Sequence, residues 1–268
     1  MQLAHRVALN GVQLDSIDSR INIKGVEEGA GKESISAVSR ASGSGQRITG
    51  RKRDTMDITV KFSLNIDEAD MATRGTVMDA VKRWARAGGV LTLNYKPGKQ
   101  IRVELAQAPG DGDLWEWTSV YSIVFRAYAV PYWEDATATS VTRANTSSYT
   151  LTMTVNGSAE TPLEFEYENT SGSACDWVQV SANGYTIRIG GMALASGSKL
   201  ILDHDANGVQ RIRKLTGSTY TSMMGKRTTI TGGLPSADEI MLAPGSASVS
   251  VSAEKAGGWK VSCKGRYA

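Results

Sequence analysis

The sequence has few of the residues on which most active sites and metal sites depend. Its 268 residues include two histidines, His5 and His204, and two cysteines, Cys175 and Cys263. Neither histidine lies near a nucleophile motif, and no Gly-x-Ser-x-Gly elbow occurs. Two cysteines imply no disulfide framework, and we expect both to be buried, reduced thiols. We therefore expect no catalytic residues, no cofactor and no metal ligands.

An excess of one charge and long apolar runs are also missing. The net charge is +3, with +1 up to Asp135 and +2 after it. Neither part has the basic excess that phosphate binding needs, so we expect no nucleic-acid binding. No stretch approaches the ~20 apolar residues of a membrane span, and the N-terminus lacks the pattern of a signal peptide. We expect a soluble protein that is made in a cytoplasm and does not insert into a membrane.

Three local patterns point to binding chemistry, and each is incomplete. Gly31-Lys32-Glu33 resembles the end of a phosphate loop, but Val26 and Glu33 replace its first glycine and its hydroxyl residue. Residues 203–208 match the first half of a calcium loop, but Lys214 stands where the bidentate glutamate belongs. Arg51-Lys52-Arg53 is a short basic run without an aromatic platform. We interpret the three as a polar segment, a polar turn and a solvated segment.

The residues that are present indicate two domains. A composition of 41% hydrophobic and 21% charged residues is ordinary for globular proteins, and the length suffices for two cores. Apolar alternation over Tyr121 to Tyr128 predicts a strand, which Pro131 ends before Tyr132 and Trp133. Residues 136–147 are mostly Thr, Ser and Ala, as in a linker. We predict an N-terminal domain over 1–135, a linker over 136–147 and a C-terminal domain over 148–268.

The N-terminal part has the pattern of an α+β domain, a sandwich or barrel-like sheet with one helix. Asn10-Gly11 between apolar residues predicts a hairpin, and the alternation over 57–64 predicts a strand with one buried face. A helix is expected from Asp67 or Glu68 to Ala87, with an apolar stripe and Gly88-Gly89 after its end. A second hairpin is expected around 96–99. Residues 25–53 lack a continuous period and predict a long projecting arm.

The C-terminal part is expected to be all β. Short alternating runs separated by turn residues favour a sandwich of two packed sheets. The expected strands cover residues 149–155, 163–168, 177–180, 185–189, 199–203, 209–212, 246–252 and 259–267.

Several stretches, in this order and spacing, resemble the distal tail protein family of long-tailed bacteriophages, often called Dit. The resemblance runs through nearly the whole chain, with departures at 41–46 and 216–235. It rests on Ile48-Thr49-Gly50-Arg51 before the strand at 57–64, on the helix end at 81–89 followed by 90–93, on Lys96-Pro97-Gly98-Lys99, on 121–128 running into Pro131-Tyr132-Trp133-Glu134-Asp135, and on 156–162 and 199–203.

This resemblance implies a non-enzymatic virion protein at the tip of a phage tail. Its N-terminal domain is expected to form a homo-hexameric ring, and its C-terminal domain to be a galectin-like sandwich. The implied partners are the tail tube protein, the tape measure protein, a tail-tip or tail-associated lysin protein and a receptor-binding protein. In such a ring, Arg47, Arg51, Lys52 and Arg53 of the arm are expected to meet acidic groups of a neighbouring subunit or of the tube.

Two other function classes remain open from the sequence. One is a carbohydrate-binding module, whose sandwich would display a flat ring from among Trp177, Tyr185, Tyr220 and Trp259 beside amides or carboxylates. The other is an accessory hydrolase, for which the chain offers no clear carboxylate pair. An exposed aromatic residue in a concave polar face distinguishes the first from a plain structural protein.

Overall fold

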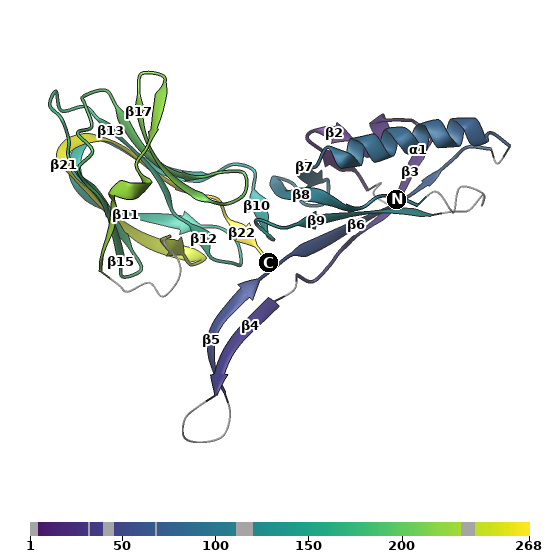
Figure 1. The fold of residues 1–268 in the computed structure, drawn as a ribbon, viewed down its shortest axis with the longest axis horizontal. Coiled ribbons are helices and arrows are strands. Elements are labelled where there is room, and N and C mark those ends of the chain that lie inside the picture. Colours follow the sequence, from purple (N-terminus) through teal and green to yellow (C-terminus); the bar gives the residue numbers. More distant parts are fainter. Residues whose placement is uncertain (1–4, 32, 40–45, 68, 111–119, 232–238) are drawn as a thin grey trace. The chain divides into compact units, whose positions relative to one another are not determined.

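The chain divides into two compact units, Met1–Trp133 and Glu134–Ala268. The structure is a computed structural model, and it describes residues 5–31, 33–39, 46–67, 69–110, 120–231 and 239–268. Strands dominate both units, and the described residues contain one α-helix (Figure 1). The expected fold class, mainly β with one helix in the N-terminal part, is confirmed. No described helix is long and apolar enough to cross a membrane.

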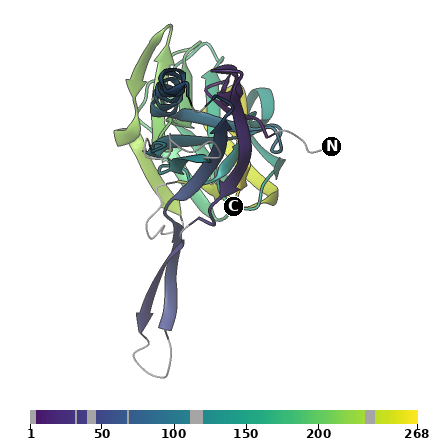
Figure 2. The ribbon, with the colours of Figure 1, turned by 90° about the vertical axis from the view of Figure 1, so that its right-hand side faces the viewer.

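The first unit is a curved sheet with the strand order β2-β1-β7-β8-β9-β6-β3. Strands β6 and β9 are neighbours in the interior of this sheet, and their burial alternates residue by residue, as expected for strands with one buried face. The helix α1 lies across this sheet (Figures 1 and 2). The elements are β1 (Val7–Leu9), β2 (Val12–Gln13), the 3-10 turn η1 (Leu14–Ser16), β3 (Ile21–Glu28), β6 (Met56–Leu64), α1 (Met71–Arg86), β7 (Gly89–Leu93), β8 (Lys99–Gln107) and β9 (Tyr121–Ala127).

The expected Asn-Gly hairpin is confirmed, and it also ties the start of the chain to the end of the helix. Asn10 and Gly11 both have positive φ angles, 52° and 81°, which the turn requires. The Asn10 amide donates to the Gly88 carbonyl at 2.7 Å and accepts from the Val90 amide at 2.9 Å. The turn residue therefore holds the strand that follows α1.

The helix begins later than the acidic residues at 67 and 68 indicate. Its first residue is Met71, and the Asp70 carboxylate accepts a hydrogen bond from the Thr73 amide, so Asp70 is the N-cap. Residue 68 lies outside the described residues. Most of the expected apolar stripe is buried, as Val77, Met78, Val81 and Ala85 are, whereas Met71 and Trp84 are half-buried.

The second unit is organised by one long strand, β21. Its first half pairs with β14 and its second half with β13, while β11 pairs along its other edge. The sheet order is β18-β17-β16-β13-β21-β14-β15-β19, with β11 beside β21. The strands are β10 (Trp133–Asp135, which contains the division), β11 (Thr139–Val155), β12 (Thr161–Pro162), β13 (Glu164–Asn169), β14 (Val178–Ala182), β15 (Tyr185–Ile189), β16 (Lys199–His204), β17 (Gln210–Thr216), β18 (Thr219–Ser222), β19 (Arg227–Thr231), β20 (Met241–Leu242), β21 (Gly245–Cys263) and β22 (Arg266–Tyr267), with the 3-10 turn η2 (Met224–Lys226).

Three expectations from the sequence are corrected by the structure. The expected linker over 136–147 is a strand from Thr139 onward, because its backbone pairs with residues 257–263 of β21 and its β-branched residues favour strands. The two strands expected at 246–252 and 259–267 are largely one strand. The projecting arm expected over 25–53 begins later than expected, because residues 25–28 belong to β3, and its described part consists of two paired strands over 33–39 and 46–53. Residues 40–45 of the Gly/Ser segment, and 232–238, lie outside the described residues.

Candidate assembly surface

A two-stranded ribbon, formed by β4 (Glu33–Ser39) and β5 (Gln46–Arg53), leaves the sheet of the first unit (Figures 1 and 2). The two strands pair antiparallel, with a register shift after Ser36. Among the described strands they pair with each other alone. Because an isolated two-stranded hairpin is marginally stable in water, this ribbon gains from a surface that covers it.

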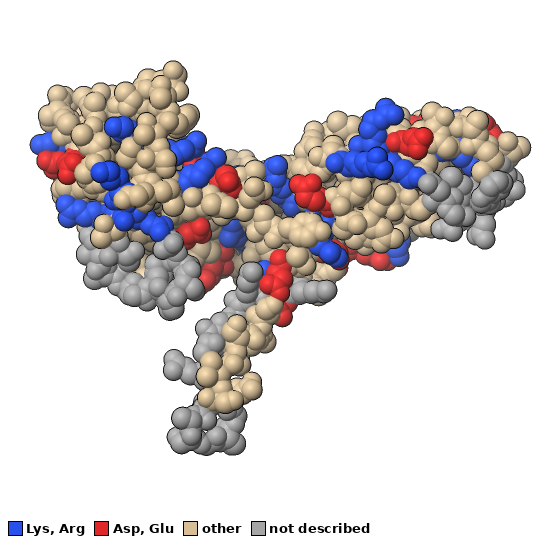
Figure 3. All heavy atoms as spheres, viewed as in Figure 1, with Lys and Arg blue, Asp and Glu red and all other residues tan. Residues whose placement is uncertain are grey.

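The described side chains of β4 form an exposed surface without charge beyond the ribbon's base. All seven residues of β4 are exposed, including Ile35 at 54% and Val38 at 58%. After Glu33 the strand carries no charged residue, and Figure 3 shows this surface as an uncharged stretch beyond the acidic side chains at the base. Exposed apolar residues on a strand with open edges are the features of a protein contact.

The four basic residues expected to make the contact all lie on β5. The side chains of Arg47, Arg51 and Lys52 lie outside the described residues, so their surroundings stay a prediction. Arg53 ends the strand, and its guanidinium lies over the ring of Tyr132, 5.3 Å from the centroid. Its Nε is buried without a hydrogen-bond partner among the described residues. Arg53 thus packs against its own chain at the base of the ribbon.

Two residues of the second unit, His204 and Cys263, have pKa values that their surroundings raise. His204 is buried, with Nδ1 3.2 Å from Glu164 Oε1 and Nε2 3.5 Å from Glu239 Oε2. Burial opposes its charge, but the two carboxylates outweigh burial and raise the pKa of His204 to about 9. Burial, with the nearby carboxylates, raises the pKa of the Cys263 thiol to about 11. At neutral pH His204 is therefore an imidazolium and Cys263 a thiol, rather than a base and a thiolate.

The partial calcium motif is a turn between β16 and β17, and protein groups occupy its carboxylates. Asp205 Oδ1 accepts from the amides of Asn207 and Val209 at 2.8 and 3.0 Å. Asp203 pairs with Arg211 and Arg213 at 3.1 and 2.5 Å. No group of three or more His, Cys, Asp or Glu side chains suited to a metal ion occurs among the described residues.

The four aromatic residues named for the carbohydrate-binding alternative differ in exposure: Tyr220 is 53% exposed, Trp177 and Tyr185 are half-buried, and Trp259 is buried. Trp259 is a core residue, 2% exposed, whose ring lies 4.7 Å from that of Tyr167. Arg188 lies over the ring of Trp177 at 4.3 Å, and Arg213 over that of Tyr220 at 4.5 Å. A sugar would therefore compete with a guanidinium for a face of either ring.

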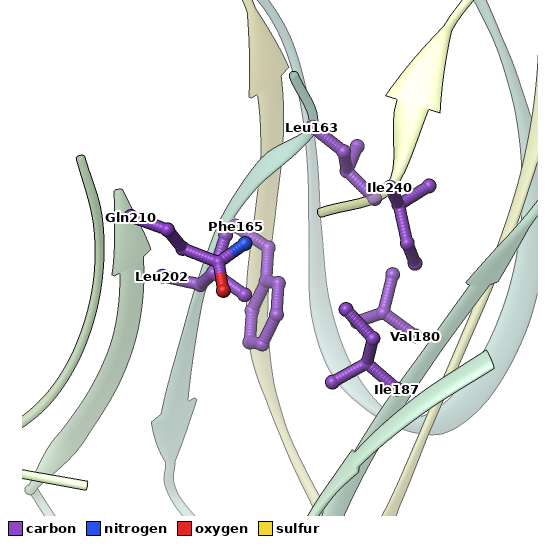
Figure 4. Close-up of a pocket in the computed structure, with 7 residues that line it drawn as sticks. All are labelled: Leu163, Phe165, Val180, Ile187, Leu202, Gln210 and Ile240. Carbon is purple, nitrogen blue, oxygen red and sulfur yellow. The ribbon is translucent and has the colours of Figure 1, made fainter. Parts of the chain in front are cut away.

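A cavity inside the second unit is too small for a ligand. Side chains from several strands of the second unit converge on it (Figure 4). The free space is about 10 Å³, room for one water molecule at most. Its polar side chain, Gln210, accepts a hydrogen bond from Arg227 at 2.7 Å. The cavity lining is Leu163, Phe165, Val180, Ile187, Leu202, Gln210 and Ile240.

Comparison with known proteins shows the fold. No protein-family model and no curated protein matches the sequence. Among solved structures, the Dit protein of phage SPP1, described as a paradigm of the hub adsorption apparatus in phages that infect Gram-positive bacteria, superimposes with a TM-score of 0.67. That match has 11% sequence identity and covers 99% of this chain and 100% of the other.

Two structures of the phage P2 baseplate in its activated conformation also match. The one with calcium has a TM-score of 0.46 at 8% identity, and covers 99% of this chain and 98% of the other. The one with strontium has a TM-score of 0.44 at 7% identity, with 97% coverage of both chains. The match to SPP1 Dit shows that this chain has, along nearly its whole length, the fold of a phage distal tail protein of the SPP1 Dit type, as the sequence resemblance predicts.

Proposed function

We propose that this protein is a structural component at the distal end of a phage tail, where six copies form a ring that links the tail tube to the tip and the host-adhesion apparatus. The observation that carries the proposal is the match in fold to SPP1 Dit, which spans both units and all of that chain. The protein then acts by assembly and not by catalysis, and it resides in the virion.

The ribbon supports this proposal because a ring requires two different complementary patches on each protomer. The exposed strand β4, which has no charged residue after Glu33, provides one such patch, since a neighbouring protomer would cover Ile35 and Val38 and stabilise the two strands. On β5, Arg47, Arg51 and Lys52 would add charge complementarity to a neighbour or to the tube. The partners we propose are further copies, the tail tube and tape measure proteins, a tail-tip lysin and a receptor-binding protein.

Removal of the ribbon should abolish the ring and leave the first unit folded. We would replace residues 35–51 by a short Gly-Ser turn, which keeps Glu28, Gly31 and Arg53 at the base. The expected result is loss of the large species in light scattering and negative-stain images, with circular dichroism and melting close to wild type.

A pair of point variants tests the same surface with less change to the chain. Ile35→Asp with Val38→Asp should weaken assembly, because a charge buried in the contact loses its hydration. Val209→Asp is the matched control, since Val209 is 59% exposed and lies in the second unit. Rings that persist in the shortened protein would place the contact elsewhere and contradict the role of the ribbon.

A further inference from the structure

The segment that leads from β3 into the ribbon is held at its start by the end of the first unit. Glu28, the last residue of β3, accepts a hydrogen bond from Trp133 Nε1 at 2.7 Å. It also accepts from the Tyr95 hydroxyl at 3.0 Å and pairs with the Lys96 ammonium at 2.9 Å. Lys96 in turn lies over the Trp133 ring, 4.9 Å from its centroid. One carboxylate thus joins β3, the turn between β7 and β8, and the last residue of the unit.

The burial of these groups makes the contact stronger than a surface ion pair. Trp133 is 1% exposed, and the side chains of Glu28 and Lys96 are 22% and 28% exposed. Burial, together with the negative charge of Glu28, raises the pKa of Tyr95, so its hydroxyl remains a donor. Hydrogen bonds to a charged group contribute more to stability than hydrogen bonds between neutral groups.

The end of the second ribbon strand, β5, is held by Tyr132, the residue next to Trp133. Arg53, the last residue of β5, stacks on Tyr132. Gly31, between β3 and β4, lies against the same guanidinium, since a Cβ at Gly31 would lie 1.9 Å from Arg53 Nε. Tyr132 therefore contacts the last residue of β5, and Trp133 contacts the last residue of β3, from which the chain runs on to β4. Both aromatic residues stand immediately before the chain enters the second unit at Glu134.

We propose that Glu28, Arg53, Tyr132 and Trp133 form a clamp that sets the direction of the ribbon and couples its base to the segment by which the chain leaves the first unit. Glu28 is the positioning residue of this clamp. Two strands tethered by free loops would sample many directions, and docking would have to restrict them; a clamped base is organised before docking. The inference rests on the proposed function in one respect, that docking of the ribbon drives assembly.

The test compares two neighbouring glutamates of β3. Glu28→Gln keeps the size of the side chain but removes the charge paired with Lys96 and one acceptor. Glu27→Gln is the matched control, because Glu27 pairs with Lys61 on the exposed surface. In protein diluted until it is monomeric by light scattering, Glu28→Gln should speed amide exchange in 33–39 and 46–53 several-fold, and Glu27→Gln should leave it unchanged.

A second variant and an assembly readout complete the test. Trp133→Phe removes the N–H donor alone and should speed the same amides, while melting stays within a few degrees of wild type. Both clamp variants should weaken self-association roughly tenfold, the effect of losing about 1.4 kcal/mol of pre-organisation. Ribbon exchange that is the same in Glu28→Gln, Trp133→Phe and wild type would overturn the clamp. Because exchange is measured on the monomer, this outcome is distinct from a ribbon that plays no part in assembly.

Discussion

Replacement of Gly257 by alanine should destabilise the second unit by about 3 kcal/mol, the upper range of the cost of overpacking a core. A Cβ at this position of β21 would lie 2.3 Å from the Glu168 carbonyl oxygen and 2.5 Å from the Tyr167 ring. The carbonyl belongs to the paired strand β13, and Tyr167 is fully buried beside Trp259, so neither can move away without disturbing the core.

The neighbouring glycine provides the control for this prediction. A Cβ at Gly258 would meet its nearest atom, the Glu168 Cβ, at 3.9 Å, an ordinary contact. Gly258→Ala should therefore be neutral or slightly stabilising, because alanine lowers the entropy of the unfolded chain. Calorimetry of the full chain, with amide exchange in 164–169 and 257–263, measures both variants. If the two variants had the same melting temperature, this result would contradict the close approach at Gly257.

The second unit should lose about 3 kcal/mol of stability between pH 6 and pH 9, because His204 is protonated in the folded state. Its pKa is about 9 when folded and 6.5 in the ordinary unfolded chain, a difference of 2.5 units at about 1.36 kcal/mol each. The raised pKa means that the folded state binds the proton more tightly. The extra stability is therefore fully present below pH 6.5 and disappears as the pH rises through 9.

Denaturant unfolding of the full chain at both pH values tests this prediction against His204→Gln. Glutamine donates to a carboxylate but does not titrate, so the variant should show little change between pH 6 and pH 9. Glu164, Glu239 and Asp205 are titratable groups that interact with His204, and the variant retains all three. A wild-type protein whose stability is the same at both pH values would contradict an imidazolium between the carboxylates.

Local patterns predicted the elements whose own residues decide their structure. The strand at 57–64 alternates apolar and polar residues, and its burial alternates in the same way. The Asn10-Gly11 turn and the strand from Tyr121 were equally local, because turn residues and β-branched residues favour these conformations in any protein.

Elements that form by pairing with a strand distant in the sequence were not predictable from local patterns. Residues 139–147 have the composition of a linker, and they form a strand because β21 offers an edge more than 100 residues later. Residues 253–258 include Gly257 and Gly258, which indicate a turn, but these glycines let β21 continue past Tyr167. The ribbon likewise has no apolar alternation, because the first unit does not bury it.

The basis of the candidate site was partly visible in the sequence. The length of the arm and the aromatic pair Tyr132-Trp133 were conspicuous in the sequence. In the structure, Tyr132 lies against Arg53, the last residue of the ribbon. Glu28 was not conspicuous, because its partners Tyr95, Lys96 and Trp133 are distant in sequence and meet through the fold. A single glutamate at the end of a strand carries no local signal for such a contact.

The mass of the purified full chain, measured by light scattering over a series of concentrations and followed by negative-stain imaging, tests the proposed function most directly. We expect a species of six protomers whose share of the protein grows with concentration, because weak rings dissociate on dilution. Images of that species should show closed rings with a central opening. A chain that remains monomeric or stops at dimers at the highest concentration would contradict the ring.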